Sequence, residues 1–561
     1  MRYHTHNDLL DDLANLVKLH PFHTQRFQIG TSKKGKPLVG IRISKDIGAP
    51  KRASRQAFDG GNNNANSDLP LAMRPKVKLI GNMHGNEPTG RELLIHFARY
   101  LLEGERMGEP RSSALLGQID LHILPTMNPD GFERGTEGVC SGGSYSAGRL
   151  NEGYKDLNRD FPTWWDWNKS LVNASHDIYA GRQLETQLLM NWTLSDYFTL
   201  SVNFHDGAVL VNYPWDNYHN TRQVDGIHGT PDQAEFYHLA TTYSLAHKTM
   251  LNTSAICPQW GFFPEGVTNG ADWYPVRGGM QDFNYLFAGT MEVLVEVSCC
   301  KYPARHRLLK EWDNNRESLF AFVEQATRGV RGVVRDTDGR PVRDAKVWIK
   351  RAEEGGFRKF PVRTNEEGIY FRILTETGNY SVQAFTESTE VGANGIIDRR
   401  KDRLSQVANF FYNGDQPGYV PVNLVLTVNQ NRAPTPRPEV IADPPRVTSR
   451  PRITRRPSLR RRPATTQRST TRRRQNKEIE QGQGKVDDDS KAQPFRRGDI
   501  RKVVKVPRPS TTTTAAPAET TLSPEDENAL KKRQINEIAP ARNFDPSPHM
   551  QRGEPVTFSQ R

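Results

Sequence analysis

Apolar residues in the first 327 positions recur with the periods of strands and helices in turn. Residues 76–80 have the pattern of a buried strand, and from Pro88 onward apolar residues recur at helical spacing. Further strands are predicted at 38–43, 119–125, 198–204 and 291–298, and further helices from Leu9 onward, at 185–193 and at 308–325. Strands that alternate with helices predict an α/β domain, in which a mixed sheet carries helices on both faces. A polar, Asn- and Gly-rich insert at 45–74 is expected to be a surface loop.

The pattern changes at Gly329 to short strands at regular spacing. Strands are predicted at 332–335, 346–349, 368–372, 380–384 and 420–426, with a turn at Asp338-Gly339. This spacing is typical of an all-β sandwich of about 100 residues. We therefore expect three parts, at 1–327, 328–430 and 431–561.

The last part differs from the others in composition. Residues 434–561 are rich in Pro, Thr, Arg and Gln and have too few apolar positions to bury a core, so we expect a disordered tail. From position 432 the tail holds 29 Lys and Arg against 15 Asp and Glu, a net charge of +14, whereas the whole chain carries +13. The preceding part is near neutral, so its function is not indicated by the basic charge. The tail could bind heparan sulfate, anionic lipid headgroups or nucleic acid, or be a solvated linker with O-glycosylated threonines.

Cysteine usage indicates an oxidising compartment. The chain has four cysteines, which allow two disulfides in three connectivities, and five Asn-X-Ser/Thr sites, at Asn168, Asn173, Asn191, Asn252 and Asn379. No run of about 18 apolar residues occurs, so we expect no membrane-spanning helix and no hydrophobic lipid-anchor signal. The chain opens without a recognisable signal peptide. We nevertheless expect a secretory-pathway or extracellular protein, with an N-terminus that could be incomplete.

Three residues have the types and positions of zinc ligands. His84 and Glu87 lie three apart on the turn between the strand at 76–80 and the next helix, and imidazole with carboxylate is part of a zinc ligand set. His205 follows another predicted strand, and two strand ends of one sheet can meet over a common ion. Three protein ligands leave the fourth position to water, as in catalytic zinc sites.

A hydrolytic zinc site also needs a carboxylate base beside the metal. Glu296 is the candidate, because it stands in an apolar strand where an isolated carboxylate would be costly without a function. Glu292 lies on the same face, about 13 Å away along the strand.

Ordered motifs resemble those of the zinc metallocarboxypeptidases of the regulatory (carboxypeptidase N/E) subfamily. The motifs are His84-Gly-Asn-Glu87, Asn128-Pro-Asp-Gly-Phe-Glu133, Gly148-Arg149, Asp156-Leu-Asn-Arg-Asp-Phe-Pro162, Asn269-Gly-Ala-Asp-Trp-Tyr274, Gly278 to Tyr285 and Glu296-Val-Ser-Cys299. The resemblance implies that family's fold, with an eight-stranded type of mixed sheet. It extends to the sandwich, which resembles the transthyretin-like domain that follows in those enzymes.

The resemblance also implies roles for individual residues. His84, Glu87 and His205 match the ligands of one zinc ion, and Glu296 matches the general base. Arg149 matches the arginine that polarises the scissile carbonyl.

Three further positions match residues that hold the substrate. Asn158 and Arg159 match the pair that binds its C-terminal carboxylate, for which a guanidinium is well suited. Tyr285 matches the mobile tyrosine that closes over bound peptide.

Acidic residues indicate which C-terminal residue is released. Asn212 and Asp216 follow His205 in the loop that lines the pocket in relatives, and Glu292 lies behind the catalytic carboxylate. An apolar side chain would leave these carboxylates unpaired, whereas Arg or Lys would pair with them. We expect release of C-terminal Arg or Lys from peptides by a monomeric enzyme.

The resemblance makes two further points about the chain. It implies disulfides Cys257–Cys299 and Cys140–Cys300. Asp206 stands where the family usually has a glycine after the third ligand, which would add a charge near the metal.

Two other functions remain open from the sequence. A catalytically silent relative could bind peptide C-termini as an adhesion module, which Asp206 favours and intact Glu296 opposes. A cytosolic carboxypeptidase could trim acidic tails, but its pocket should be basic, which Asp216 and Glu292 oppose.

Overall fold

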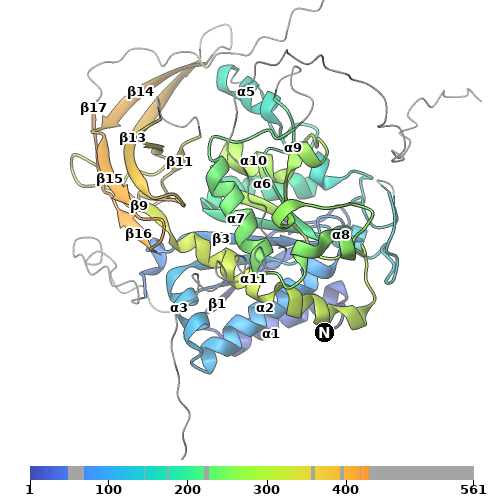
Figure 1. The fold of residues 1–561 in the computed structure, drawn as a ribbon. Coiled ribbons are helices and arrows are strands. Elements are labelled where there is room, and N and C mark those ends of the chain that lie inside the picture. Colours follow the sequence, from blue (N-terminus) through green and yellow to red (C-terminus); the bar gives the residue numbers. More distant parts are fainter. Residues whose placement is uncertain are drawn as a thin grey trace, which may run out of the picture. The chain divides into compact units, whose positions relative to one another are not determined.

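The computed structural model describes residues 1–48, 68–143, 146–173, 176–219, 226–354, 360–391, 397–416 and 418–428 (Figure 1). Most of the insert expected at 45–74 and the whole of the tail expected at 431–561 lie outside the described residues. Within them, no helix combines the length and apolar content needed to span a membrane.

An eight-stranded mixed sheet forms the centre of the first part, as predicted. Its order is β1-β2-β4-β3-β5-β8-β6-β7, and β4, β3, β5 and β8 run parallel at its middle. The strands are β1 Thr24–Thr31, β2 Pro37–Ile43, β3 Lys76–Gly81, β4 Asp120–Leu124, β5 Leu200–His205, β6 Leu210–Tyr213, β7 Val267–Asn269 and β8 Met291–Glu296. The central strands are buried on both faces, which explains their continuous apolar character.

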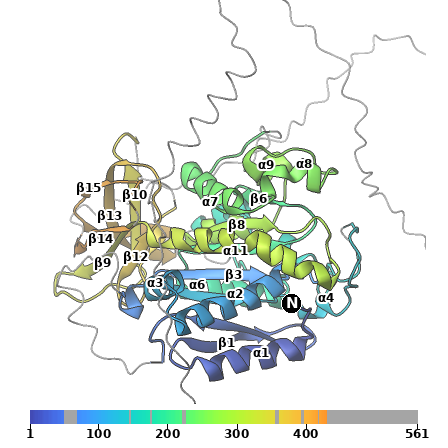
Figure 2. The ribbon, with the colours of Figure 1, turned by 60° about the horizontal axis from the view of Figure 1, so that its bottom comes forward.

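Helices cover both faces of this sheet (Figure 2). One face carries α1 His6–Leu19, α2 Thr89–Arg106, α7 Gln233–Ala246 and α11 Leu308–Glu324, while α6 Leu184–Asp196 and α10 Met280–Phe283 cover the other. Shorter helices are α3 Pro110–Gln118, α4 Pro129–Phe132, α5 Trp164–Val172, α8 Thr253–Ile256 and α9 Gly270–Trp273. The start of α1 is fixed by a capping box between Thr5 and Asp8.

The glycines at 269–285 favour a loop, but the structure has short regular elements in this region. They are β7, which ends at Asn269, then α9, α10 and a π-helical turn at Asn284–Ala288. These elements are too short for a periodic pattern to emerge, and the glycines lie between them.

The second part is all β, as predicted. Its strands are β9 Gly329–Asp336, β10 Lys346–Arg351, β11 Val362–Arg363, β12 Ile369–Arg372, β13 Gly378–Val391, β14 Ile397–Ser405, β15 Ala408–Tyr412, β16 Tyr419–Pro421 and β17 Leu424–Val428. They enclose a core of their own. The strand predicted at 420–426 is split into β16 and β17, because the Asn423 side chain accepts a hydrogen bond from the Val333 N–H between them.

Two side chains of the β part enter the first part. Arg372 of β12 forms a buried ion pair with Asp232, which precedes α7. The Phe360 ring lies 5.1 Å from the ring of Tyr285 and 5.7 Å from that of Trp215. The β part therefore supports elements of the first part directly.

Candidate metal centre and active site

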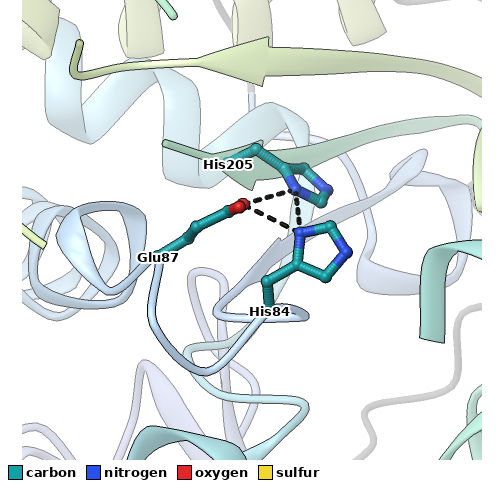
Figure 3. Close-up of side chains that lie close together, drawn as sticks. All are labelled: His84, Glu87 and His205. Atoms are coloured by element: carbon teal, nitrogen blue, oxygen red, sulfur yellow. Dashed lines mark hydrogen bonds and ion pairs between the residues drawn. The ribbon is translucent and has the colours of Figure 1, made fainter. Parts of the chain in front are cut away.

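The predicted ligands converge on one point. His84 Nδ1 and His205 Nδ1 each lie 2.9 Å from Glu87 Oε2 and 3.1 Å from each other (Figure 3). All three side chains are buried. Two imidazole nitrogens and a carboxylate oxygen that face one another at this range are donors for a shared cation. The residues thus fit zinc with three protein ligands and a fourth position left open.

The neighbouring strands β3 and β5 position these ligands. They are parallel, with Gly81 in register with Phe204, so that both deliver side chains at their carboxyl ends. The turn after β3 is held by the Asn82 amide, which donates to the carbonyls of His84 and Gly85 at 2.9 Å. Gly85 cannot carry a side chain, because a Cβ there would lie 2.1 Å from the backbone of Gly131.

Charged residues that the sequence reasoning did not assign hold the ligands in place. Asp156 Oδ1 lies 2.8 Å from His84 Nε2, which orients the ring so that Nδ1 faces the centre. Lys301 Nζ donates to Glu87 Oε1 at 2.7 Å. Asp156 belongs to a quoted motif and Lys301 follows the paired cysteines, so a search for charge near strand ends could have found both.

Electrostatics keep the ligands in the forms that bind metal. Burial lowers the pKa of His205 to about 4, so its imidazole is neutral and retains a lone pair. Burial opposes ionisation of Glu87, but His84 and Lys301 hold the pKa of Glu87 well below its usual range.

Glu296 lies beside the ligands without joining them. It is the last residue of β8 and is in register with His205 of β5. Its Oε2 is buried and has no hydrogen-bond partner among the described residues. Burial and the charge of Glu87 raise the pKa of Glu296 to about 7, so this carboxylate can take up and release a proton near neutral pH.

Arg149 lies at the same centre. Its guanidinium donates to Glu87 Oε1 at 2.9 Å and to Asp156 Oδ2 at 2.7 Å. Zinc, when bound here, would polarise a carbonyl and activate water. The Arg149 side chain offers a fixed positive charge beside that position.

The pair predicted to bind a carboxylate is close by. Asn158 is buried and accepts a hydrogen bond from the Met280 N–H at 2.9 Å. Arg159 is exposed, and its Nη1 donates to the Asn158 carbonyl. The guanidinium is thus open to a substrate carboxylate.

A polar cluster combines two predicted residues with one that was missed. The Gln281 amide donates to Asn212 Oδ1 at 3.0 Å and to Asp216 Oδ1 at 2.6 Å. Burial raises the pKa of Asp216 to about 6, although Arg159 opposes the shift. Gly279 permits this packing, because a Cβ there would lie 2.2 Å from Asp216 Oδ2. Gln281 could have been found in the sequence because it follows Gly278 and Gly279 closely in a quoted motif.

Glu292 is not part of this cluster. Its Oε2 accepts hydrogen bonds from Ser201 and Asn284, and Asn284 Oδ1 in turn accepts from Lys78 Nζ. Lys78 and Glu292 are both fully buried inside the sheet. Glu292 therefore lies on a buried strand face because a buried lysine, Lys78, is close to it. The sequence pattern did not predict that these two residues lie near each other.

The prediction for Tyr285 is wrong. Its side chain is fully buried and its hydroxyl donates to Asp232, because the π-helical turn directs it into the core. It cannot close over a peptide from there. Tyr274, which is 41% exposed, instead lies close enough to Glu296 and Arg149 to interact electrostatically with them. Burial of its hydroxyl and the charge of Glu296 raise the pKa of Tyr274 to about 12.

Asp206 is buried rather than open to the centre. Its Oδ2 accepts a hydrogen bond from the Thr89 N–H at 2.9 Å, at the start of α2. Burial raises the pKa of Asp206 well above its usual range. The residue thus satisfies a helix end that has no cap of its own.

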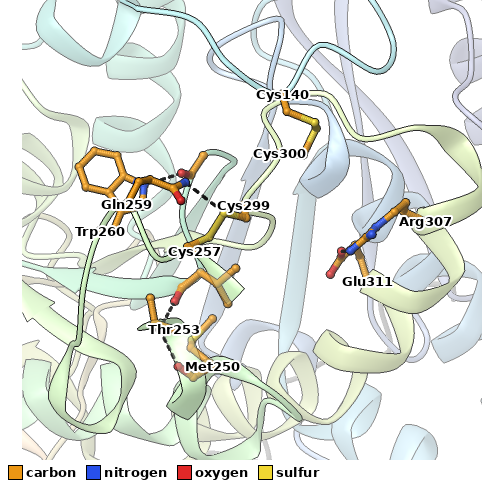
Figure 4. Close-up of a disulfide and its surroundings, with 12 residues drawn as sticks. Cys140, Met250, Thr253, Cys257, Gln259, Trp260, Cys299, Cys300, Arg307 and Glu311 are labelled. Carbon is orange, nitrogen blue, oxygen red and sulfur yellow. Dashed lines mark hydrogen bonds and ion pairs between the residues drawn. A yellow bond between two sulfur atoms is a disulfide. The ribbon is translucent and has the colours of Figure 1, made fainter. Parts of the chain in front are cut away.

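Two disulfides brace the segment after Glu296 (Figure 4). They join Cys140 to Cys300 and Cys257 to Cys299, which confirms the expected pairing. Adjacent cysteines therefore tie two separate loops to the end of β8.

Comparisons with known proteins agree with this site. Residues 9–318 match the zinc carboxypeptidase family, Peptidase_M14. Carboxypeptidase D of Drosophila melanogaster is 39% identical over 386 residues, which cover 68% of this chain and 25% of that protein. Carboxypeptidase E of Caenorhabditis elegans is 37% identical over 426 residues, 73% of this chain and 86% of that protein. The carboxypeptidase N catalytic chain of Rattus norvegicus is 35% identical and covers 68% of this chain and 80% of that protein.

The chain spans a quarter of the carboxypeptidase D relative and most of the other two. More than half of the chain lies in the family match, and the ligand cluster lies within the matched residues. This protein belongs to the zinc carboxypeptidase family.

Proposed function

We propose that this protein is a zinc-dependent metallocarboxypeptidase that releases C-terminal Arg or Lys from peptides and proteins. The convergence of His84, Glu87 and His205, with Glu296 in register beside them, carries the proposal. A single cluster of this kind among the described residues supports one zinc ion per chain.

Different residues of the chain would transfer the proton, stabilise the developing charge and bind the substrate. Glu296 accepts a proton from water and passes it to the leaving amine, which its pKa of about 7 suits. Arg149 supports the negative charge that develops on the carbonyl oxygen. Asn158 and Arg159 hold the terminal carboxylate, which confines cleavage to the last peptide bond.

Tyr274 takes the role first considered for Tyr285. Its ring is exposed, and its hydroxyl lies within the electrostatic reach of Glu296 and Arg159. It can cover a bound peptide and donate a hydrogen bond to it.

Preference for basic residues rests on Asp216. This buried carboxylate, with Gln281 and Asn212 around it, would pair with a guanidinium or ammonium group. An apolar side chain would leave it unpaired, at a cost of about 1–3 kcal/mol.

The test is release of arginine from dansyl-Ala-Arg, with and without a zinc chelator. We expect chelator-sensitive cleavage, one zinc per chain by metal analysis, and little cleavage of dansyl-Ala-Phe. The Glu296→Gln protein should bind the peptide without cleaving it. Binding without cleavage by the native protein would identify a silent peptide-binding relative, and preferential cleavage of dansyl-Ala-Glu would identify a trimmer of acidic tails.

The setting of this activity belongs to the same proposal. Two disulfides favour the secretory pathway or the extracellular space, where peptide processing occurs. The protein would act as a monomer, and its basic tail would bind heparan sulfate or anionic lipid headgroups.

A further inference from the structure

Aromatic side chains gather on the surface next to the catalytic centre. Trp260 and Tyr274 are 39% and 41% exposed, and Phe263 and Trp273 are half-buried. Phe262, which directly precedes Phe263 in the chain, is 67% exposed. The Trp273 ring lies 5.2 Å from Trp260, 6.0 Å from Phe263 and 4.7 Å from Tyr274. We call these five residues the aromatic ledge. Single exposed apolar residues are ordinary, but a contiguous group of this kind marks a binding surface.

The ledge is fixed to the strands that carry the catalytic residues. Cys257 is bonded to Cys299, three residues after Glu296 (Figure 4). The Trp260 indole N–H donates to the Gly207 carbonyl at 2.6 Å, two residues after His205. Its aromatic surface is therefore held in place before a ligand arrives, which reduces the entropy lost on binding.

The inner end of the ledge reaches the active site. Tyr274 interacts electrostatically with Glu296, Arg159 and Asp216. From Tyr274 the rings continue without a gap through Trp273 to Trp260 and Phe263. The surface is thus continuous from the catalytic centre to solvent.

The path of a bound peptide away from the catalytic centre indicates what binds to the aromatic ledge. Asp216 is 2% exposed, and a Cβ at Gly270 or Gly279 would lie 2.3 or 2.2 Å from its carboxylate oxygens, so Asp216 lies at the inner end of the site, where only the last residue of a peptide would reach it. The preceding residues must extend through the open side, where the ledge is exposed. Aromatic faces bind apolar side chains, and tryptophan and tyrosine are enriched where binding energy concentrates.

We propose that the aromatic ledge is a subsite for apolar side chains in the two or three residues before the scissile bond. The enzyme would then prefer peptides in which apolar residues precede the C-terminal Arg or Lys. This inference rests on the proposed function and adds the class of substrate that the site selects.

The test compares acetyl-Phe-Phe-Ala-Arg with acetyl-Gly-Gly-Ala-Arg on the full zinc-loaded chain. We expect kcat/KM to be about tenfold higher for the Phe peptide, mainly through a lower KM, since its two aromatic side chains would contact the ledge in the bound peptide. Phe262→Ser and Trp260→Ala should each lower this ratio. Trp260→Phe, which keeps a ring but loses the bond to Gly207, should lower it less than Trp260→Ala.

Phe22→Ser is the matched control, since Phe22 is 64% exposed and lies outside the ledge. It should keep the native ratio. The inference is overturned if the native ratio is near one, if Phe262→Ser leaves it unchanged, or if Phe22→Ser lowers it equally. Phe262→Ser removes little packing, so it stays informative should Trp260→Ala fail to fold. Absence of cleavage of both peptides by the native enzyme would instead contradict the proposed function.

Discussion

At the scale of single residues, Asp216 sets a pH dependence of substrate binding. Burial raises its pKa to about 6. Only the ionised carboxylate attracts a guanidinium, so binding weakens as pH falls through that value. The KM for dansyl-Ala-Arg should be about tenfold higher at pH 5 than at pH 7, because the ionised fraction falls by that factor. Steady-state kinetics over this range provide the measurement. In Asp216→Asn the KM should be high and flat with pH, and a flat profile in the native enzyme would refute the assignment.

Asp206 is expected to matter for stability. It supplies the acceptor for the Thr89 N–H, and α2 has no cap from its own segment. Asp206→Ala should lower the free energy of unfolding by about 1–2 kcal/mol, and Asp206→Asn by less, because an amide oxygen still accepts the bond. Denaturant unfolding with a chelator present in all samples measures this without a contribution from metal binding. Equal losses in the two variants would argue against capping.

Some site residues could be predicted from the sequence and others could not, depending on the element in which they lie. His84, Glu87 and His205 could be predicted because each stands at a strand end, where chemistry gathers in parallel sheets. Tyr274 and Tyr285 could not be told apart, since both lie in one glycine-rich segment. Only the π-helical turn, which no periodicity reveals, decides that Tyr285 points into the core.

At the scale of elements, the parallel strands were predicted well and their side-chain partners were not. The hydrophobic period and the apolar content predict a strand such as β8. Neither of them predicts which residues of a distant strand pair with it. Glu292 therefore looked like a second pocket acid, whereas its carboxylate accepts from Ser201 on β5 and from Asn284, which in turn accepts from Lys78 on β3. The helix α7 went unpredicted because its apolar positions are not confined to one face.

Mutation can test whether the buried residues Glu292 and Lys78 contribute to stability rather than to specificity. Burial raises the pKa of Glu292 to about 7 and lowers that of Lys78 to about 8. Glu292→Leu should cost about 3–5 kcal/mol of stability, because it leaves a buried lysine without its carboxylate, and adding Lys78→Met should recover much of it. Unfolding of the two variants measures both effects.

The conservative variant tests the pocket itself. Glu292→Gln keeps the acceptor for Ser201 and Asn284, so its preference for Arg over Phe should equal that of the native enzyme. Asp216→Asn should lower kcat/KM for the arginine peptide by about 30-fold or more, since it removes one partner of a buried charge pair. If Glu292→Gln lost the preference for Arg over Phe, Glu292 would have to contribute to the specificity pocket.

At the scale of the molecule, the β part stabilises the catalytic part. Arg372 and Asp232 are 4% and 0% exposed, and Tyr285 shares the same carboxylate. Arg372→Ala should therefore destabilise the protein by about 3–5 kcal/mol. Arg340→Ala is the control, because Arg340 pairs with Asp338 at an exposed site within the β part, where an ion pair contributes about 0–1 kcal/mol. Similar melting temperatures for the two variants would contradict a bracing role.

The basic tail should be separable from catalysis. Every residue assigned to the site lies between His84 and Lys301, whereas the excess positive charge lies beyond position 431. A chain that ends at residue 433 should keep its native kcat/KM for dansyl-Ala-Arg. It should also elute from heparin at much lower salt, because each lost contact between a cation and the polyanion removes counterion release. Elution at an unchanged salt concentration would place heparin binding elsewhere, and a fall in kcat/KM would show that the tail contributes to the active enzyme.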